Sequence, residues 1–188
     1  MERFDVVNRH DLPTGKLTTK PEAHANNLLH RVVAVYVFDK QGRLYVQQHK
    51  TSGLFDHSVG GHVSAGEDYA TAARREAEEE LGLSGQQLEP VLLGMYSDEA
   101  FAPGLQKHGY YHMFGIYECY PTDGWEFKPN DEVEHIFPDT VEHIVLEMNE
   151  TPSKFTPGFI NTMAKYLEVK NLPYELGISS IRQNWGAL

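Results

Sequence analysis

The sequence contains a single cysteine, Cys119, among its 188 residues. One cysteine excludes an internal disulfide framework and fits a reducing compartment. No apolar run approaches the ~18 residues that a membrane-spanning helix needs. The N-terminus, Met1–Asp5, lacks the basic stretch followed by an apolar segment that marks a secretory signal. We therefore expect a cytoplasmic protein that does not associate with a membrane.

Basic residues are scarce. The chain has 16 Lys and Arg against 27 Asp and Glu, which gives a formal net charge of −11. A surface that binds nucleic acid needs clustered Lys and Arg to neutralise phosphates, so we expect no nucleic acid polymer as a partner. Small phosphate compounds stay compatible with an acidic protein, provided that divalent cations lie between the two.

Turn residues and hydrophobic patterning predict strands interleaved with helices. Strands are expected at residues 32–38, 44–48, 88–96, 110–120 and 133–137, with a short strand and a loop within 54–63. Turn residues at 39–42 suggest that the first two strands pair as a hairpin. Helices are expected at residues 67–82, from Asp139 to about Met148, and from Thr156-Pro157 to about Val169. This order indicates a single α/β or α+β layered domain over residues 1–188.

The helix at residues 67–82 carries the most informative side chains. Glu76, Glu79 and Glu80 have the spacing i, i+3 and i+4, so a helix places all three carboxylates on one face. Like charges at this spacing destabilise an isolated helix by roughly 0.2–0.5 kcal/mol per pair. Hard oxygen ligands on one rigid face suit Mg²⁺. From the helix alone, a solvated face with Glu–Arg pairs remains the alternative.

The spacing around this helix resembles the Nudix box, which extends here over residues 61–83. Its fixed positions and the closing aliphatic position are all filled, by Gly61, Glu67, Arg75, Glu76, Glu79, Glu80, Gly82 and Leu83. One departure is Ala77, which stands where the family usually has a larger aliphatic residue. Residues at this many fixed offsets do not coincide by chance, so the sequence is identified as a member of the Nudix hydrolase superfamily.

The resemblance implies an α/β/α sandwich with a mixed β-sheet, in which the box forms a loop–helix–loop. It also implies an enzyme in which water attacks a phosphorus of a diphosphate compound, most often a nucleoside di- or triphosphate or a nucleoside diphosphate linked to another group. Such enzymes require Mg²⁺, with Mn²⁺ as a substitute. Dimers are frequent in the family, so a homodimer is a further expectation.

The roles of the box residues follow from the same resemblance. Glu76, Glu79 and Glu80 would hold the metal, together with the backbone carbonyl of Gly61. Arg75 would pair with Glu67 and fix the loop against the helix.

The catalytic candidates in the box are Glu76, the first choice for the base, and Glu79. Outside the box, Glu132 is a candidate for the base or for an additional metal ligand.

The resemblance extends beyond the box to the isopentenyl-diphosphate-isomerase-like subgroup. It rests on Phe4–Asn8, Glu22–His24 and Leu28–Arg31 around the N-terminal extension, residues 1–30, and on Phe155-Thr156-Pro157 before the last predicted helix, and it spans about residues 4–170. Because of this resemblance, an isomerase that moves a double bond in an isoprenoid diphosphate is the main rival to a hydrolase. The irregular tail, from Asn171 to residue 188, has no predicted element. A Nudix-fold module that binds a nucleotide without cleaving it is a third interpretation, which the intact box disfavours.

The rival isomerase needs residues that this chain lacks. Its proton-transferring cysteine would fall at Gly60, and glycine has no side chain to move a proton. The isomerase also uses a metal held by three histidines and two glutamates. The histidines could correspond to His24, His30 and His62, but the strand near residues 110–112 has no acidic residue. The sequence therefore favours hydrolysis and leaves the role of the three histidines open.

Overall fold

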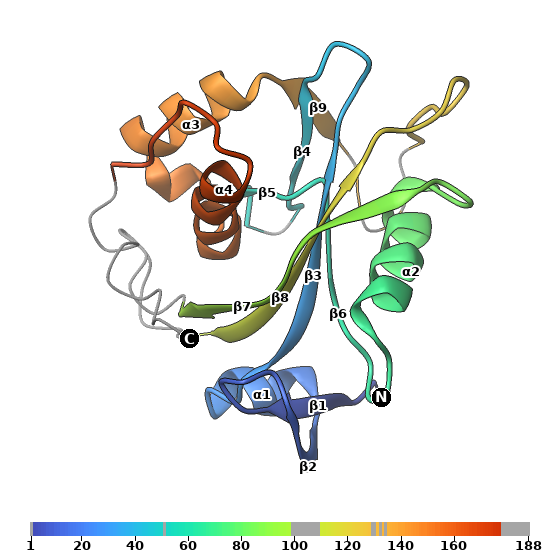
Figure 1. Ribbon diagram of the computed structural model, residues 1–188, viewed down its shortest axis with the longest axis vertical. Helices are drawn as coiled ribbons and strands as arrows, with labels where there is room; N and C mark the ends of the chain where they lie inside the picture. The colour runs from blue at the N-terminus through green and yellow to red at the C-terminus, as the bar shows by residue number, and fades with distance from the viewer. Residues whose placement is uncertain are drawn as a thin grey trace.

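The computed structural model describes residues 2–50, 52–98, 110–128, 131, 133 and 135–177 (Figure 1). Its strands are β1 (Phe4–Val7), β2 (Pro13–Thr18), β3 (His30–Val37), β4 (Leu44–Gln48), β5 (Phe55–Asp56), β6 (Val59–His62), β7 (Leu88–Asp98), β8 (Tyr111–Cys119) and β9 (Ile136–Asp139). Its α-helices are α1 (Lys20–Ala25), α2 (Tyr69–Leu81), α3 (Val141–Glu150) and α4 (Pro157–Val169). In the described part of the chain, no helix has the length and apolar character to span a bilayer.

The larger sheet is mixed. Its order is β2-β1-β3-β8-β7, and β6 pairs with β3 on the same edge as β1, opposite β8. Strands β3 and β8 run parallel over eight residue pairs, from His30 opposite His112 to Val37 opposite Cys119. The other pairings in this sheet are antiparallel. The mixed sheet expected from the sequence is therefore confirmed.

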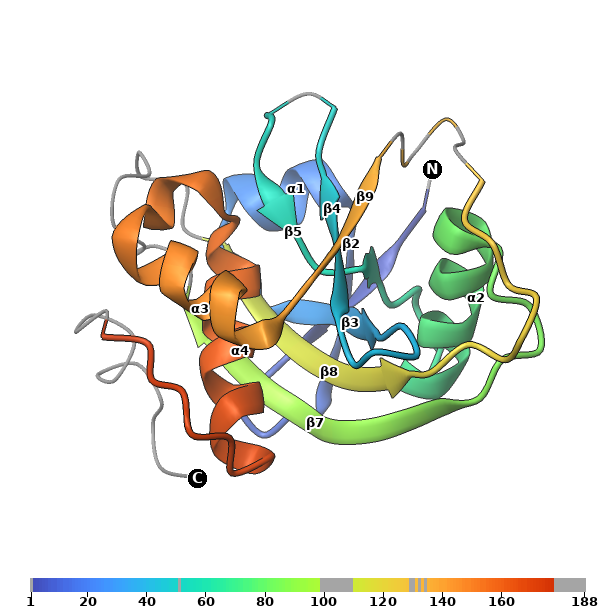
Figure 2. The same cartoon turned by 90° about the horizontal axis from the view of Figure 1, so that it is seen from above.

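Helices cover both faces of this sheet. Alternate residues of β3 point to opposite faces, so Ala34 and Tyr36 pack in the cluster under α3 and α4, whereas Val33 and Val35 pack under α2. Burial on both faces explains why β3 is an almost uninterrupted hydrophobic run. Figures 1 and 2 show α3 and α4 on one side of the sheet and α2 on the other. The predicted α/β/α sandwich is confirmed.

Capping residues set the helix ends. Asp68 accepts a hydrogen bond from the Thr71 backbone N–H at the start of α2, and Gly82 ends the helix with a left-handed φ of 64°. Thr156 caps α4 before Pro157, as the sequence predicted. Helix α3 begins after Thr140, one residue beyond the expected cap at Asp139, because the Thr140 side chain accepts from the His143 N–H.

The predicted hairpin between residues 32–38 and 44–48 is wrong. Strand β4 lies in a separate three-stranded sheet of order β5-β4-β9, and one isolated bridge, Phe38 to Leu44, joins it to the end of β3. Both edges of β3 are already paired, with β8 and with β6 or β1, so β4 has no place beside it. The N-terminal extension forms β1 and β2, which belong to the larger sheet and continue it beyond β3, and the short helix α1 that leads into β3 (Figure 1).

Candidate active site

Helix α2 turns two of its three box glutamates inward. Glu76 is 9% exposed and Glu80 is 6% exposed. The side chain of Glu79 is 51% exposed, so it lies at the rim. Charged side chains are almost never fully buried without a partner. The inward glutamates therefore mark the functional face of the helix.

Gly61 allows Glu76 to lie against strand β6. A β-carbon built on Gly61 would lie 2.0 Å from Cδ of Glu76 and 2.2 Å from its Oε1. No side chain fits there, because real β-carbons do not approach heavy atoms closer than 3.0 Å. The glycine thus brings the strand backbone and the carboxylate together, which is the arrangement that a shared cation requires.

Arg75 joins the helix, the loop and the strand. One guanidinium nitrogen donates to the carbonyl of His62 at 2.9 Å and to Glu67 at 3.0 Å. The other donates to Glu76 at 2.8 Å, with Glu79 at 3.4 Å. Glu67 also accepts from the Ser64 backbone N–H at 2.9 Å, which closes the loop before α2. Hydrogen bonds from Arg75 and Ser64 outweigh burial and lower the pKa of Glu67.

The inward carboxylates resist ionisation. Burial, followed by the charge of Glu76, raises the pKa of Glu80 well above its ordinary value, although Gln47 donates to Glu80 at 3.1 Å. Burial also raises the pKa of Glu76, against the opposing effect of Arg75. A divalent cation between these groups would favour their charged forms.

A cavity of about 560 Å³ opens beside these groups. It is lined by Glu76, Glu79, Glu80, Gly61 and Arg75, and also by Lys20 at the start of α1. Lys20 could not be predicted from the sequence, since no local motif marks it and only the packing of the N-terminal extension brings it here. An ammonium group facing a metal site is suited to contact a substrate phosphate.

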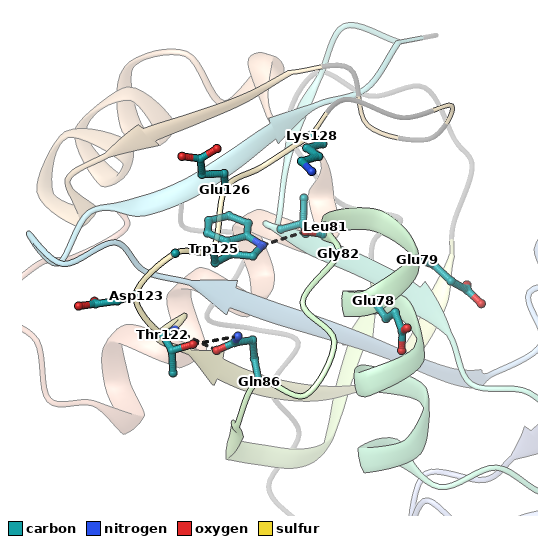
Figure 3. Close-up of a pocket in the computed structure, with 11 residues that line it drawn as sticks. Glu78, Glu79, Leu81, Gly82, Gln86, Thr122, Asp123, Trp125, Glu126 and Lys128 are labelled. Carbon is teal, nitrogen blue, oxygen red and sulfur yellow. Dashed lines mark hydrogen bonds between the residues drawn. The ribbon is translucent and has the colours of Figure 1, made fainter.

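A second cavity, of about 670 Å³, lies on the other side of the α2 C-terminus (Figure 3). Its wall is fixed by Trp125, whose ring N–H donates to the carbonyl of Leu81 at 3.0 Å. Glu79 borders both cavities, but in Figure 3 its carboxylate points away from Trp125. The second cavity is lined by Glu78, Asp123, Glu126 and one lysine, Lys128, and of the fixed residues of the box only Glu79 and Gly82 reach it.

Other residues named from the sequence fall in different places. Glu132 lies outside the described residues. At Gly60, an added β-carbon would meet nothing closer than His57 Nδ1 at 3.8 Å, so the fold has room for a side chain there. Cys119 is buried, and burial raises the pKa of its thiol to about 11.

The structure also gathers four histidines, His24, His30, His62 and His112, with ligand atoms within 4.8 Å of one another. The sequence predicted three of them, and His112 has no local motif that would mark it as a fourth. Among the described residues, the box glutamates do not form a comparably tight group of ligand atoms. This difference follows from Glu79, which is directed outward at the rim.

Comparison with known proteins gives one family. The model of the NUDIX domain matches residues 28–159. An isopentenyl-diphosphate Delta-isomerase of Serratia proteamaculans is 30% identical over 169 residues, which cover 86% of this chain and 89% of the relative. An uncharacterised Nudix hydrolase of Streptomyces coelicolor is 43% identical over 89 residues, 45% of this chain and 49% of the relative. Among solved structures, DR0079 from Deinococcus radiodurans has a TM-score of 0.60 at 27% identity, and the match covers 80% of this chain and 90% of that one.

Proposed function

The chain belongs to the Nudix hydrolase superfamily, in its isopentenyl-diphosphate-isomerase-like subgroup, and we propose that it hydrolyses a diphosphate linkage in a small molecule with a divalent cation held by Glu76, Glu79 and Glu80. Mg²⁺ is the expected cation, with Mn²⁺ as a substitute. The proposed substrate is a nucleoside di- or triphosphate, or a nucleoside diphosphate joined to another group. We place the activity in the cytoplasm, in keeping with the single cysteine, and expect a homodimer by analogy with the family.

The burial of Glu76 and Glu80 beside the backbone of Gly61 carries this proposal. The guanidinium of Arg75 donates to Glu76, to Glu67 and to the His62 carbonyl. This one positive charge is shared among several groups and does not neutralise the carboxylates gathered there. Their oxygen ligands, together with the Gly61 carbonyl, fit a hard divalent ion that keeps coordination positions for water and phosphate oxygens.

When bound, the metal ion supplies Lewis-acid activation of water and neutralises charge on the diphosphate. Glu76, our first choice for the base, accepts a proton from the attacking water, and Glu79 is the second choice. A new oxygen–phosphorus bond forms while the bridging oxygen leaves with its electron pair. Lys20 contacts a phosphate at the cavity rim, and Arg75 holds the loop so that the carboxylates keep their positions.

Isomerisation of an isoprenoid diphosphate is the second candidate, because the chain aligns over most of its length with a protein named as an isomerase. The chain's own residues disfavour it. Gly60 cannot move a proton although the fold has room for a side chain there. Within the described residues, the histidine group includes no carboxylate to complete the isomerase metal site.

A metal-supplemented screen of nucleotide and isoprenoid diphosphates tests the proposal, with release of phosphate and diphosphate as the readout. We expect turnover with Mg²⁺ or Mn²⁺, its loss with a chelator, and a drop of orders of magnitude in Glu79→Gln. The matched control is Glu78→Gln, an exposed neighbour outside the 560 Å³ cavity. Turnover that is indifferent to metal, or equal losses in the two variants, would show that the assigned site is wrong.

A further inference from the structure

Strand β4 turns the side chain of Gln47 toward helix α2. Alternate residues of a strand point to opposite faces. Leu44 and Val46 pack in the cluster under α3 and α4, whereas Tyr45 packs against the cluster under α2. Gln47 lies two residues beyond Tyr45 and shares its face, although it is a polar residue that is only 7% exposed. An amide buried in this way requires a hydrogen-bond partner.

That partner is Glu80 of the box helix. Gln47 Nε2 donates to Glu80 Oε2 at 3.1 Å, across 33 positions of the chain. Hydrogen bonds from the backbone of Gly60 and from Gln47 oppose the rise that burial causes in the pKa of Glu80. Arg75 donates to the other two box glutamates. The most deeply buried box carboxylate therefore has an uncharged side-chain donor, which comes from a different sheet.

The backbone of Gln47 is fixed on both sides. Strand β4 is the central strand of the smaller sheet, and in it Gln47 lies opposite Asp56 of β5 and Ile136 of β9. The Asp56 carboxylate is in turn held by His57 Nδ1 at 2.6 Å and by the Thr156 hydroxyl at 2.8 Å. Gln47 thus presents its amide from a rigid element, as the precise orientation of a neighbouring group requires.

An amide suits this position better than a cationic side chain. A lysine or arginine at residue 47 would pair with Glu80 and place a positive charge beside the carboxylates that we propose to hold a divalent cation. The amide of Gln47 donates a hydrogen bond but carries no charge, so the carboxylate keeps its negative charge for the metal. Hydrogen-bond partners of this kind orient the carboxylates that bind metal ions.

We propose that Gln47 is a positioning residue of the metal site, which orients the Glu80 carboxylate toward the 560 Å³ cavity and preserves its charge for a divalent cation. This inference rests on the proposed function, because it takes Glu80 to be a metal ligand. Gln47 is not among the described residues that line the cavity, whereas Glu80 is. Gln47 therefore acts on the metal through Glu80 and does not contact the substrate.

The neighbouring residue, Gln48, provides a matched control. It follows Gln47 on the same strand, so its side chain points to the other face, where its Nε2 donates to the Gly53 carbonyl at 2.9 Å. Methionine is unbranched like glutamine but has no amide to donate a hydrogen bond. Gln47→Met and Gln48→Met therefore each remove one amide hydrogen bond from β4, and only the first removes it from a box carboxylate.

Binding of Mn²⁺ to the full-length chain without substrate tests the proposal, with free Mn²⁺ measured by electron paramagnetic resonance. We expect Gln48→Met to bind like the wild type and Gln47→Met to bind about 10- to 100-fold more weakly, as is usual when the partner of a metal ligand is lost. In the Glu80→Gln background, Gln47→Met should cause no further loss, because the amide acts through Glu80. Wild-type affinity in Gln47→Met, or the same loss with and without Glu80, would overturn the proposal.

NMR of the wild type keeps the proposal testable if Gln47→Met does not fold. On titration with Mg²⁺, the side-chain amide signals of Gln47 should shift with the midpoint of metal binding, whereas those of Gln48 should stay in place. A Gln47 amide that does not respond to the bound metal would overturn the proposal. Absence of divalent-cation binding by the wild type would overturn the proposed metal site as well, so the two failures are told apart before any variant is compared.

Discussion

Glu76 lies against the backbone of Gly61, so that a β-carbon at residue 61 would be 2.0 Å from the glutamate Cδ. We predict that Gly61→Ala displaces the carboxylate and lowers kcat by about 100-fold, because a misplacement of about 1 Å can cost that much. The matched control is Gly60→Ala, whose β-carbon would meet nothing closer than 3.8 Å. Its kcat should stay within about twofold of the wild type.

Steady-state kinetics with saturating Mg²⁺ and a Mg²⁺ titration check this pair of variants. The Gly61→Ala enzyme should require more Mg²⁺, and its circular dichroism spectrum should match that of the wild type. Equal activity of the two variants would mean that Glu76 does not need its observed position.

Local geometry explains why the box could be predicted from the sequence. Three glutamates at i, i+3 and i+4 share a helix face wherever the helix is placed, and Gly82 ends that helix through its own left-handed φ of 64°. Such features depend on neighbours in the sequence. The same reasoning predicted α4 from Thr156 and Pro157.

Long-range pairing explains what the sequence could not show. The hairpin prediction used only the turn at residues 39–42, whereas the position of β4 depends on β8, which is more than 60 residues away and occupies the edge of β3. The positions of His112 and Lys20 also depend on long-range contacts. Strand register brings His112 beside His30, and the folded N-terminal extension brings Lys20 to the cavity that Glu76 and Glu80 line. Neither residue has a local motif.

Arg75 should tolerate no substitution, lysine included. Its planar guanidinium reaches the His62 carbonyl, Glu67 and Glu76 together, and a single ammonium cannot make these contacts at once. We predict that Arg75→Lys lowers kcat by about 10- to 100-fold with a smaller change in KM, because the loop before α2 loses its tether. Arg74→Lys, at the exposed neighbouring position, is the control and should keep wild-type kinetics. A larger effect on KM than on kcat would instead assign Arg75 to substrate binding.

Restoring a thiol at residue 60 should not produce an isomerase. The fold has room for the side chain of Gly60→Cys, so the variant should melt within a few degrees of the wild type. The histidine group of the described residues still lacks the carboxylates of the isomerase set. Incubation of either protein with isopentenyl diphosphate and Mg²⁺ or Zn²⁺ should therefore give no dimethylallyl diphosphate by NMR. Product from the variant would show that the cysteine alone had been missing, and product from the wild type would replace the proposed function.

Acid should destabilise the fold through Asp56, whose side chain is 16% exposed. Its carboxylate contacts His57 Nδ1 at 2.6 Å and His49 Nε2 at 3.0 Å, and it accepts from the Thr156 hydroxyl at 2.8 Å. Burial opposes ionisation, but the charge of His57 and the hydrogen bonds from both histidines outweigh it and lower the pKa of Asp56. As pH falls below about 3.8, the unfolded chain therefore takes up a proton that the folded chain does not, and stability decreases.

Asp56→Asn tests this linkage through the free energy of unfolding, measured with denaturant at several pH values. At pH 7 the variant should lose about 3 kcal/mol, because one partner of a buried pair is removed. Below pH 4 its stability should fall less steeply than that of the wild type, since residue 56 no longer binds a proton on unfolding. Asp123→Asn is the control, because that carboxylate is 87% exposed and pairs with Lys40 at the surface. Parallel pH profiles for Asp56→Asn and the wild type would assign the acid sensitivity to other carboxylates.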